Sequence, residues 1–211
     1  MPVRAGRPDV LTVDRYRPAD RPALYDVCLR TGDSGADASH LYEDGDLLGH
    51  VFLGAYLALE PGLARVLRRQ DGSAVGYCVA TADTRAFEER CEHAWWPELR
   101  SRYDAPTDDD ESPDAGMARL IHHPPRTDGP WLPEFPAHLH VDLLPEAQGG
   151  GHGRRILEKV LDAVAQTRAP GVHLGVSGRN ARAVGFYEHL GFAVLERGPE
   201  GMTMGMTLPR R

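Results

Sequence analysis

The most informative stretch of this sequence is AHLHVDLLPEAQGGGHGRR, residues 137–155. It predicts a strand over 137–144, then a glycine-rich turn that opens a helix over 152–167. Glycines let the backbone turn sharply and approach a ligand closely, and the first free N–H groups of a helix attract an anion. The run therefore predicts a phosphate-binding turn, with Arg154 and Arg155 adding positive charge. A sharp strand–helix connection would, however, need glycine for its own geometry.

Strands and helices alternate outward from this run, and the helix over 152–167 carries an apolar stripe at helical spacing. Between strands at 63–69 and 74–82, Asp71-Gly72 is a hairpin signal. The other predicted strands are 11–17, 172–177, 192–197 and 202–208, and the other helices are 20–31 (Asp20 as N-cap), 84–103 (bent at Pro97) and 180–190. The apolar stretch 47–59 is compatible with helix or irregular structure. The pattern predicts an α/β fold class with a mixed sheet.

Two stretches depart from this alternation. Residues 104–116, DAPTDDDESPDAG, contain six acidic residues and predict a flexible, solvated loop. Residues 122–136 contain five prolines together with Trp131, Leu132 and Phe135, which indicate an ordered surface loop. Neither stretch marks a domain boundary, because the segments on either side are too small for comfortable independent cores. We therefore expect a single domain over residues 1–211.

The composition narrows the class of protein. The 211 residues include 24 basic and 31 acidic ones, a net charge of −7 that disfavours non-specific binding to nucleic acid or anionic lipid. No apolar run approaches the roughly 20 residues that span a bilayer, and Met1–Asp9 lacks the apolar stretch of a secretory signal. Cys28, Cys78 and Cys91 are odd in number and widely spaced. They predict neither a disulfide framework nor a zinc site, and fit reduced thiols in the cytoplasm.

A second motif follows the strand predicted at 172–177 and reads NARAVGFYEHLGF, residues 180–192. Helical spacing places Asn180, Ala183, Val184 and Tyr187 on one face. The small side chain of Ala183 lets a ligand pass close to the helix, and Asn180 can cap the helix and offer an amide to that ligand. Tyr187 is compatible with a ligand contact or with a core aromatic residue.

Together the two motifs resemble the GNAT superfamily of acetyl-CoA-dependent acyltransferases. The family's pyrophosphate loop, Q/R-x-x-G-x-G/A, matches residues 148–153, and its N-x-x-A-x-x-F-Y-x-x-x-G-F motif matches residues 180–192. The resemblance covers residues 137–197 and implies the GNAT fold, a central mixed and splayed sheet flanked by helices. The sheet would open at the strand ending near Leu144.

The chain also resembles, more narrowly, bacterial relatives of the C-terminal acetyltransferase-like domain of eukaryotic O-GlcNAcase. Residues 80–87, 95–99 and 138–142 carry this resemblance. The eukaryotic domain is generally regarded as lacking the cofactor-binding residues. The resemblance therefore also implies an alternative, a non-catalytic acyl-CoA-binding or protein-interaction module. Because the glycine loop is intact here, we expect acetyl-CoA to bind.

The GNAT resemblance implies acetyl-CoA as cosubstrate. Its pantetheine arm would pair with backbone around Asp142, Leu143 and Leu144, and its pyrophosphate would lie on residues 149–154. The residues assigned to the cofactor are Asp142, Leu143, Leu144, Gln148, Gly149, Gly150, Gly151, His152, Gly153, Arg154, Arg155, Asn180, Ala183, Phe186 and Tyr187. The acceptor implied is an unidentified amine, either a small molecule or a protein lysine; a hydroxyl acceptor would differ only at the acceptor site. GNAT proteins often form dimers.

Acetyl transfer by direct attack needs a base for the amine and an acid for the departing thiolate. By resemblance Tyr187 is the acid. Strand alternation places His138, His140 and Asp142 on one face as candidates for the base, with Leu139, Val141 and Leu143 against the core. One or two of the three could instead be satisfied by backbone groups. We expect no metal site among them.

Two further expectations concern the same region. The backbone N–H near Leu144 could serve the thioester oxygen. Trp95, Trp96 and Trp131 could wall an acceptor cleft, although tryptophans at helix and loop positions more often pack in a core or a lid.

Overall fold

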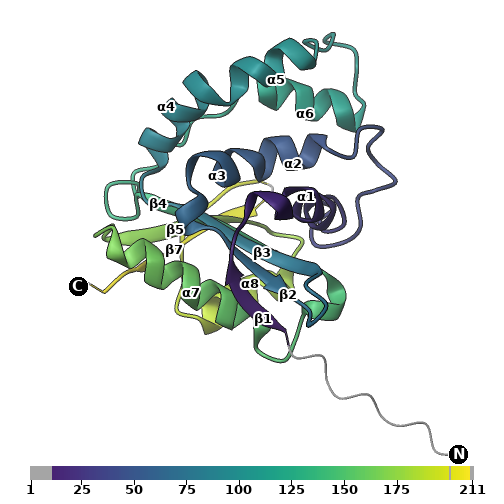
Figure 1. Ribbon diagram of the computed structural model, residues 1–211. Coiled ribbons are helices and arrows are strands. Elements are labelled where there is room, and N and C mark those ends of the chain that lie inside the picture. The colour runs from purple at the N-terminus through teal and green to yellow at the C-terminus, as the bar shows by residue number, and fades with distance from the viewer. Residues whose placement is uncertain (1–10, 200, 210–211) are drawn as a thin grey trace, which may run out of the picture.

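A computed structural model describes residues 11–199 and 201–209. Residues 1–9, for which the sequence predicts no secretory signal, lie outside this range. Within it, a mixed seven-stranded sheet has the order β1-β2-β3-β4-β5-β7-β6 (Figure 1). The strands are β1 (Thr12–Arg15), β2 (Arg65–Arg68), β3 (Ala74–Thr81), β4 (Ala137–Leu143), β5 (Gly171–Ser177), β6 (Ala193–Arg197) and β7 (Gly201–Thr207). This confirms the predicted fold class.

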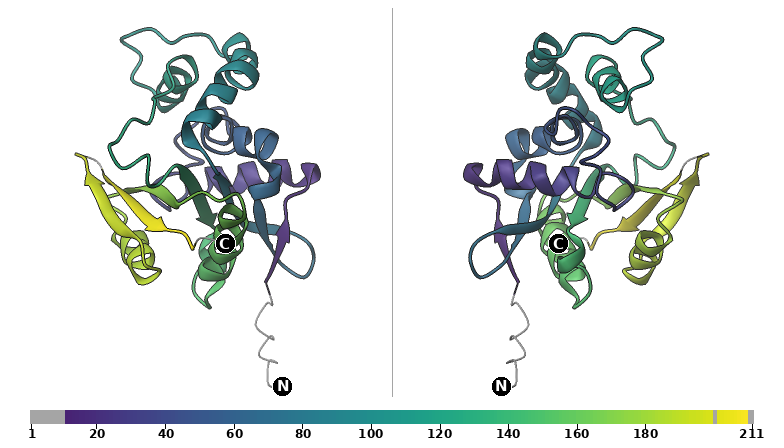
Figure 2. Two further views of the ribbon diagram at one scale, coloured as in Figure 1. Left: turned by 90° about the vertical axis from the view of Figure 1, so that its left-hand side faces the viewer. Right: turned by 90° about the vertical axis from the view of Figure 1, so that its right-hand side faces the viewer.

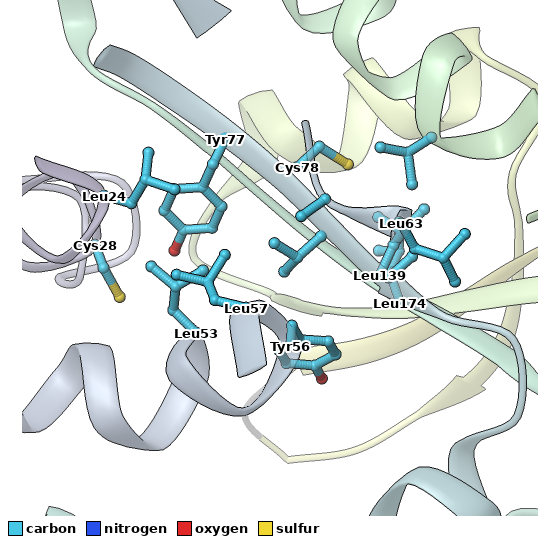
Figure 3. Packing of buried hydrophobic residues seen from close by; sticks show 14 of the residues in the cluster. Leu24, Cys28, Leu53, Tyr56, Leu57, Leu63, Tyr77, Cys78, Leu139 and Leu174 are labelled. Carbon is cyan, nitrogen blue, oxygen red and sulfur yellow. The ribbon is translucent and has the colours of Figure 1, made fainter. Parts of the chain in front are cut away.

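The helices form layers around this sheet (Figure 1). They are α1 (Arg21–Leu29), α2 (Leu47–Phe52), α3 (Gly54–Leu59), α4 (Thr84–Ala94), α5 (Trp96–Arg102), α6 (Pro113–His122), α7 (His152–Gln166) and α8 (Ala181–His189). The sheet face that carries Tyr77 meets α1 and α3, whereas Cys78 points to the opposite face (Figure 3). The buried apolar stripe of α7 packs under β2, β3 and β4, and α4, α5 and α6 form a further layer beyond α2 and α3.

Strands β4 and β5 separate soon after they begin. They pair in parallel only at Ala137↔Val172 and His138↔His173, whereas β5 pairs with β7 along its whole length. Figure 2 shows the β5–β7–β6 part of the sheet turned away from the other strands. The sheet is therefore splayed beyond His138, as expected for the strand that ends near Leu144.

The register of β3 against β4 shows which peptide groups face this opening. The Leu144 N–H donates to the Val75 carbonyl oxygen at 2.9 Å. Hydrogen-bonded pairs alternate along an antiparallel ladder, so the peptide groups of Asp142, opposite Tyr77, also point at β3. Those of Val141 and Leu143 therefore point away from β3, toward the opening.

Several predicted boundaries differ from those observed. Stretch 47–59 is helical (α2 and α3), and the helix predicted over 84–103 is two helices, α4 and α5, that meet at Trp95. Asp20 occupies the N-cap position of α1, as predicted, but its side chain makes no capping hydrogen bond. Its carboxylate accepts the Arg17 N–H at 2.7 Å and pairs with Arg68 at 2.5 Å.

The predicted acidic loop ends earlier than expected, because α6 begins at Pro113. The Ser112 hydroxyl accepts the Ala115 N–H at 3.2 Å, and Pro113 occupies the first turn. Serine followed by proline is a helix-start signal, so this helix was readable in the sequence despite the acidic composition around it.

Candidate functional site

The glycine-rich turn has the backbone geometry of an anion-binding loop. Gly149, Gly150 and Gly151 have φ of +79°, +58° and +77°, a region that other residues rarely adopt. Helix α7 therefore begins without a capping side chain. Within the described chain, no hydrogen bond uses the N–H groups of Gly153 or Arg154, which lie in its first turn. Both remain free to bind an anion.

A cavity of about 590 Å³, here called the glycine cavity, lies between this turn, β4 and α8. It contains most of the residues that the sequence assigned to a cofactor. These are Asp142, Leu143, Gln148, Gly149, Gly151, Gly153, Arg154, Asn180, Ala183, Phe186 and Tyr187. The sequence did not single out Val141, Arg182 or the 31–35 segment, which also line it.

Four residues assigned to the cofactor do not line the glycine cavity: Leu144, Gly150, His152 and Arg155. Leu144 is buried, and its N–H is bound to Val75, so it cannot serve a thioester oxygen as expected. Arg155 points elsewhere, since its Nη2 donates to the Leu11 carbonyl oxygen at 2.9 Å. The peptide groups of Asp142 face β3, so within the expected region around Asp142, Leu143 and Leu144 it is the peptide of Leu143 that faces the opening.

Gln148 and Asn180 hold the walls of the glycine cavity in place. Gln148 donates from Nε2 to the Leu143 carbonyl oxygen (2.8 Å) and accepts from Arg182 Nη1 (2.6 Å), which ties β4 to α8. Asn180 Oδ1 accepts the Ala183 N–H at 3.0 Å, which confirms the predicted cap. Its Nδ2 donates to the Ser34 carbonyl oxygen at 3.1 Å.

Tyr187 and Asp142 are the titratable side chains deepest in the glycine cavity. Tyr187 is 8% exposed, and its hydroxyl makes no hydrogen bond to another described residue. Burial and then the negative charge of Asp142 raise its pKa, so it keeps its proton at neutral pH. Tyr77, directly opposite on β3, donates to Asp142 Oδ2 at 2.5 Å. Burial raises the pKa of Asp142, and this hydrogen bond opposes the rise.

A second cavity, of about 310 Å³ and here called the histidine cavity, lies on the α2–α4 side of β4. His138, His140 and His173 line it together with aromatic residues and the start of the proline-rich loop. The principal lining residues are Tyr56, Phe87, Glu88, Cys91, Trp96, Pro124, Arg126, Thr127, His138, His140 and His173. The three polar residues predicted on one strand face are thus divided, with the two histidines in this cavity and Asp142 in the other.

The opposite face of β4 is only partly core. Leu139 is 2% exposed, as expected, but Val141 and Leu143 are partly exposed because they line the glycine cavity. Of the tryptophans, only Trp96 lines the histidine cavity. Trp95 donates to the His50 carbonyl oxygen at 3.0 Å, and the Trp131 ring lies against His173.

The histidines differ in their hydrogen bonds. Both ring nitrogens of His138 have partners, Tyr56 Oη at 2.5 Å and Thr84 Oγ1 at 2.7 Å. His173 donates from Nδ1 to the Phe135 carbonyl oxygen at 2.7 Å. His140 makes no hydrogen bond within residues 11–199 and 201–209, and burial, with His173 nearby, lowers its pKa to about 4. At neutral pH His140 is therefore a neutral ring open to the cavity.

Two further findings bear on the site. The part of the chain that the structure describes contains no group of three or more His, Cys, Asp or Glu side chains that could hold a metal ion. It also contains no helix long and apolar enough to cross a membrane. The proline-rich loop contributes to the histidine cavity but not to the glycine cavity, so it leaves the latter open.

The chain is similar to known proteins in sequence and in fold. The family described as "Acetyltransferase (GNAT) domain" matches residues 108–194. The crystal structure of SsHAT is 38% identical, with a TM-score of 0.88, and the match covers 93% of this chain and 98% of that one. Protein O-GlcNAcase of Rattus norvegicus is 26% identical over 86% of this chain, but the chain spans only 20% of that protein's length.

A shorter match involves the Peptidyl-lysine N-acetyltransferase YjaB of Salmonella typhimurium, which is 39% identical over 61 residues. It covers 28% of this chain and 39% of that protein. The match to SsHAT extends over almost the whole of both chains, and the family match includes both the glycine turn and the Asn180 motif. The chain therefore belongs to the GNAT family of acetyltransferases and is an acyltransferase.

Proposed function

We propose that the protein transfers the acetyl group of acetyl-CoA to a primary amine by direct attack. The observation that carries this proposal is that the two cavities meet on β4. Leu139 and His140 line the histidine cavity, and the next three residues, Val141 to Leu143, line the glycine cavity. A thioester in one cavity and an amine in the other would approach each other at this point of the strand.

The glycine cavity fits acetyl-CoA chemically. The free N–H groups of Gly153 and Arg154 suit a pyrophosphate, and Arg154 and Arg182 supply positive charge. The outward-facing peptide groups of Val141 and Leu143 suit the amides of a pantetheine arm. At the same end Tyr187, whose hydroxyl keeps its proton at neutral pH, can protonate the departing thiolate.

The amine loses its proton in the histidine cavity. The amine nitrogen forms a bond to the carbonyl carbon, the C–S bond breaks, and the sulfur takes the proton of Tyr187. Asp142 stays beside Tyr77 in the glycine cavity, whereas the neutral imidazoles face the amine. An imidazole, rather than the Asp142 carboxylate, is therefore the base that we propose.

Calorimetric titration with acetyl-CoA and with CoA, followed by thiol release with a panel of primary amines, tests the function. Both ligands should bind, and at least one amine should release CoA. Tyr187→Phe should slow turnover about 100-fold and leave acetyl-CoA affinity unchanged. A folded protein that binds neither ligand would overturn the proposal, and a Tyr187→Phe variant of full rate would remove Tyr187 as the acid.

A further inference from the structure

A chain of hydrogen bonds connects α3, β4 and α4 at the floor of the histidine cavity. Tyr56 Oη lies 2.5 Å from His138 Nε2, and His138 Nδ1 lies 2.7 Å from Thr84 Oγ1. Thr84 Oγ1 in turn lies 2.7 Å from the Pro136 carbonyl oxygen. Tyr56 and Thr84 were not candidates from the sequence, because only the tertiary fold places them beside β4.

The bond between Thr84 and Pro136 determines which atom donates in each of these hydrogen bonds. Two oxygens 2.7 Å apart need a proton between them, and a carbonyl oxygen has none. The single hydroxyl proton of Thr84 therefore points at Pro136, and Thr84 is 1% exposed, so no solvent competes. Its oxygen must accept from His138 Nδ1–H. His138 is thus unprotonated at Nε2, which accepts the proton of Tyr56.

This polarity determines what Tyr56 offers to the cavity. Its only proton is committed to His138, so its oxygen can only accept a further hydrogen bond. The ring is stacked on Phe87, with centroids 4.5 Å apart, and its hydroxyl points away from Leu53 and Leu57 (Figure 3). A group that enters the histidine cavity and touches this oxygen must be a donor, as an amine is.

The same series of hydrogen bonds could stabilise an additional proton on His138. If His138 took a second proton, its Nε2–H would face Tyr56 Oη and its Nδ1–H would face Thr84 Oγ1. A buried cation is costly unless its donors are paired. A protonated His140 has no such partner among the described residues. Of the two β4 histidines, only His138 would have both N–H groups paired when charged. Burial, with His140 and His173 nearby, lowers the pKa of His138 well below its usual value, so the charged form is short-lived.

We propose, on the basis of the acetyl transfer proposed above, that Tyr56 is a catalytic residue that receives the amine proton and passes its own proton to His138. As the amine nitrogen bonds to the acetyl carbon, its proton moves to Tyr56 Oη, and the Tyr56 proton moves to His138 Nε2. His138 becomes an imidazolium, and Tyr56 ends neutral. Thr84 is a positioning residue that sets the direction of the transfer.

The proton positions in this series of hydrogen bonds can be tested without any amine substrate. Long-range ¹H–¹⁵N NMR of ¹⁵N-histidine protein should show His138 protonated at Nδ1 only. Thr84→Val removes the acceptor of Nδ1–H, so the proton should move to Nε2 and point at Tyr56, whereas Thr84→Ser should keep the wild-type state. An Nε2-protonated His138 in the wild-type protein, or in Thr84→Ser, would overturn the proposal.

The catalytic role of Tyr56 is tested by measuring kcat. Tyr56→Phe should lower kcat about 100-fold with acetyl-CoA affinity unchanged, Thr84→Val should lower it similarly, and Thr84→Ser should restore it. Tyr25→Phe is the matched control. Tyr25 is 5% exposed, its hydroxyl lies 3.2 Å from His50 Nδ1, and it lines neither cavity, so its rate should stay at the wild-type value.

The outcomes separate the two proposals. Turnover of an amine at equal rates by the wild type and Tyr56→Phe would overturn the role of Tyr56 and leave the acetyltransferase function standing. Turnover of no amine by a wild type that binds acetyl-CoA would overturn the function together with that role. Loss of kcat in Tyr56→Phe, with the NMR result expected above, would support both.

Discussion

Burial keeps His140 neutral, although it sits in a cavity wide enough to admit a ligand. Its pKa is lowered to about 4, first by desolvation and then by His173. An ordinary histidine titrates near 6.5. The free energy of unfolding therefore falls as the pH falls, because His140 binds a proton in the unfolded chain but not in the folded chain.

This difference predicts a pH dependence of stability. Between pH 6.5 and pH 4 the unfolded chain binds more protons at residue 140 than the folded chain does, so the free energy of unfolding should fall as the pH falls. For His140 alone the full effect is about 3 kcal/mol. His140→Gln removes the titration.

Urea unfolding at pH 7 and pH 4.5 measures the effect. The wild-type protein should lose more stability than His140→Gln over this interval. The other buried histidines titrate in both proteins, so the difference between the two losses reports residue 140 together with its effect on the pKa of His138. Equal losses in the two proteins would show that His140 titrates normally in the folded state.

At the scale of elements, the glycine turn depends on glycine for two different reasons. Three successive glycines with positive φ let α7 start without a capping side chain, and the N–H groups of Gly153 and Arg154 in its first turn are free. Gly153 has a different role, since a Cβ there would come within 3.2 Å of Phe186 Cζ. The turn therefore needs glycine for backbone conformation at one end and for packing against α8 at the other.

Gly151 provides the prediction at this scale. Nothing lies within 4 Å of a Cβ built there, but its φ of +77° is a strained backbone conformation for any other residue, and residue 151 lines the glycine cavity. Gly151→Val should therefore weaken CoA binding at least about 10-fold, measured by calorimetry.

Gly116→Ala is the control for this change. It lies in α6, meets nothing within 4 Å and has no positive φ. It should leave affinity unchanged and stabilise the helix by roughly 0.5–1 kcal/mol. CoA affinity in Gly151→Val equal to that of the wild type would place the pyrophosphate elsewhere.

At the scale of the whole molecule, the splay divides the sheet into two parts with little pairing between them. β4 and β5 are joined only at Ala137↔Val172 and His138↔His173, and the Gln148–Arg182 contact bridges β4 and α8 from the other end. A net charge of −7 does not predict anion binding, yet Arg154 and Arg182 both line the glycine cavity. The local arrangement of charge, rather than the total, determines what this surface attracts.

A cofactor in the splay would complete the missing pairing. Hydrogen exchange should then slow on CoA binding more at the N–H groups of Val141 and Leu143, which face the opening, than at Asp142, whose N–H already faces β3. At a ligand concentration of 100 Kd the protein should gain about 2.7 kcal/mol. Amide hydrogen exchange followed by NMR measures Val141, Leu143 and Asp142 separately. Slowing at Asp142 alone would contradict the register argument.

The sequence alone sufficed for the fold class, the glycine turn and the Asn180 cap, because each depends on residues close together in the chain. Glycine runs, helix caps and apolar stripes act over a few residues, so their patterns stay readable. The same local logic should have found α6, since Ser112 and Pro113 are a helix start. The acidic composition hid this signal.

The division of the site between two cavities depends on contacts that form only in the folded protein. Alternation along β4 placed His138, His140 and Asp142 on one face, but separating the histidines from Asp142 required the splay and the α2–α4 layer. Tyr77 and Tyr56 reach β4 from 65 and 82 residues away. No local pattern encodes contacts at that separation, because strand register and helix packing create them only when the chain has folded.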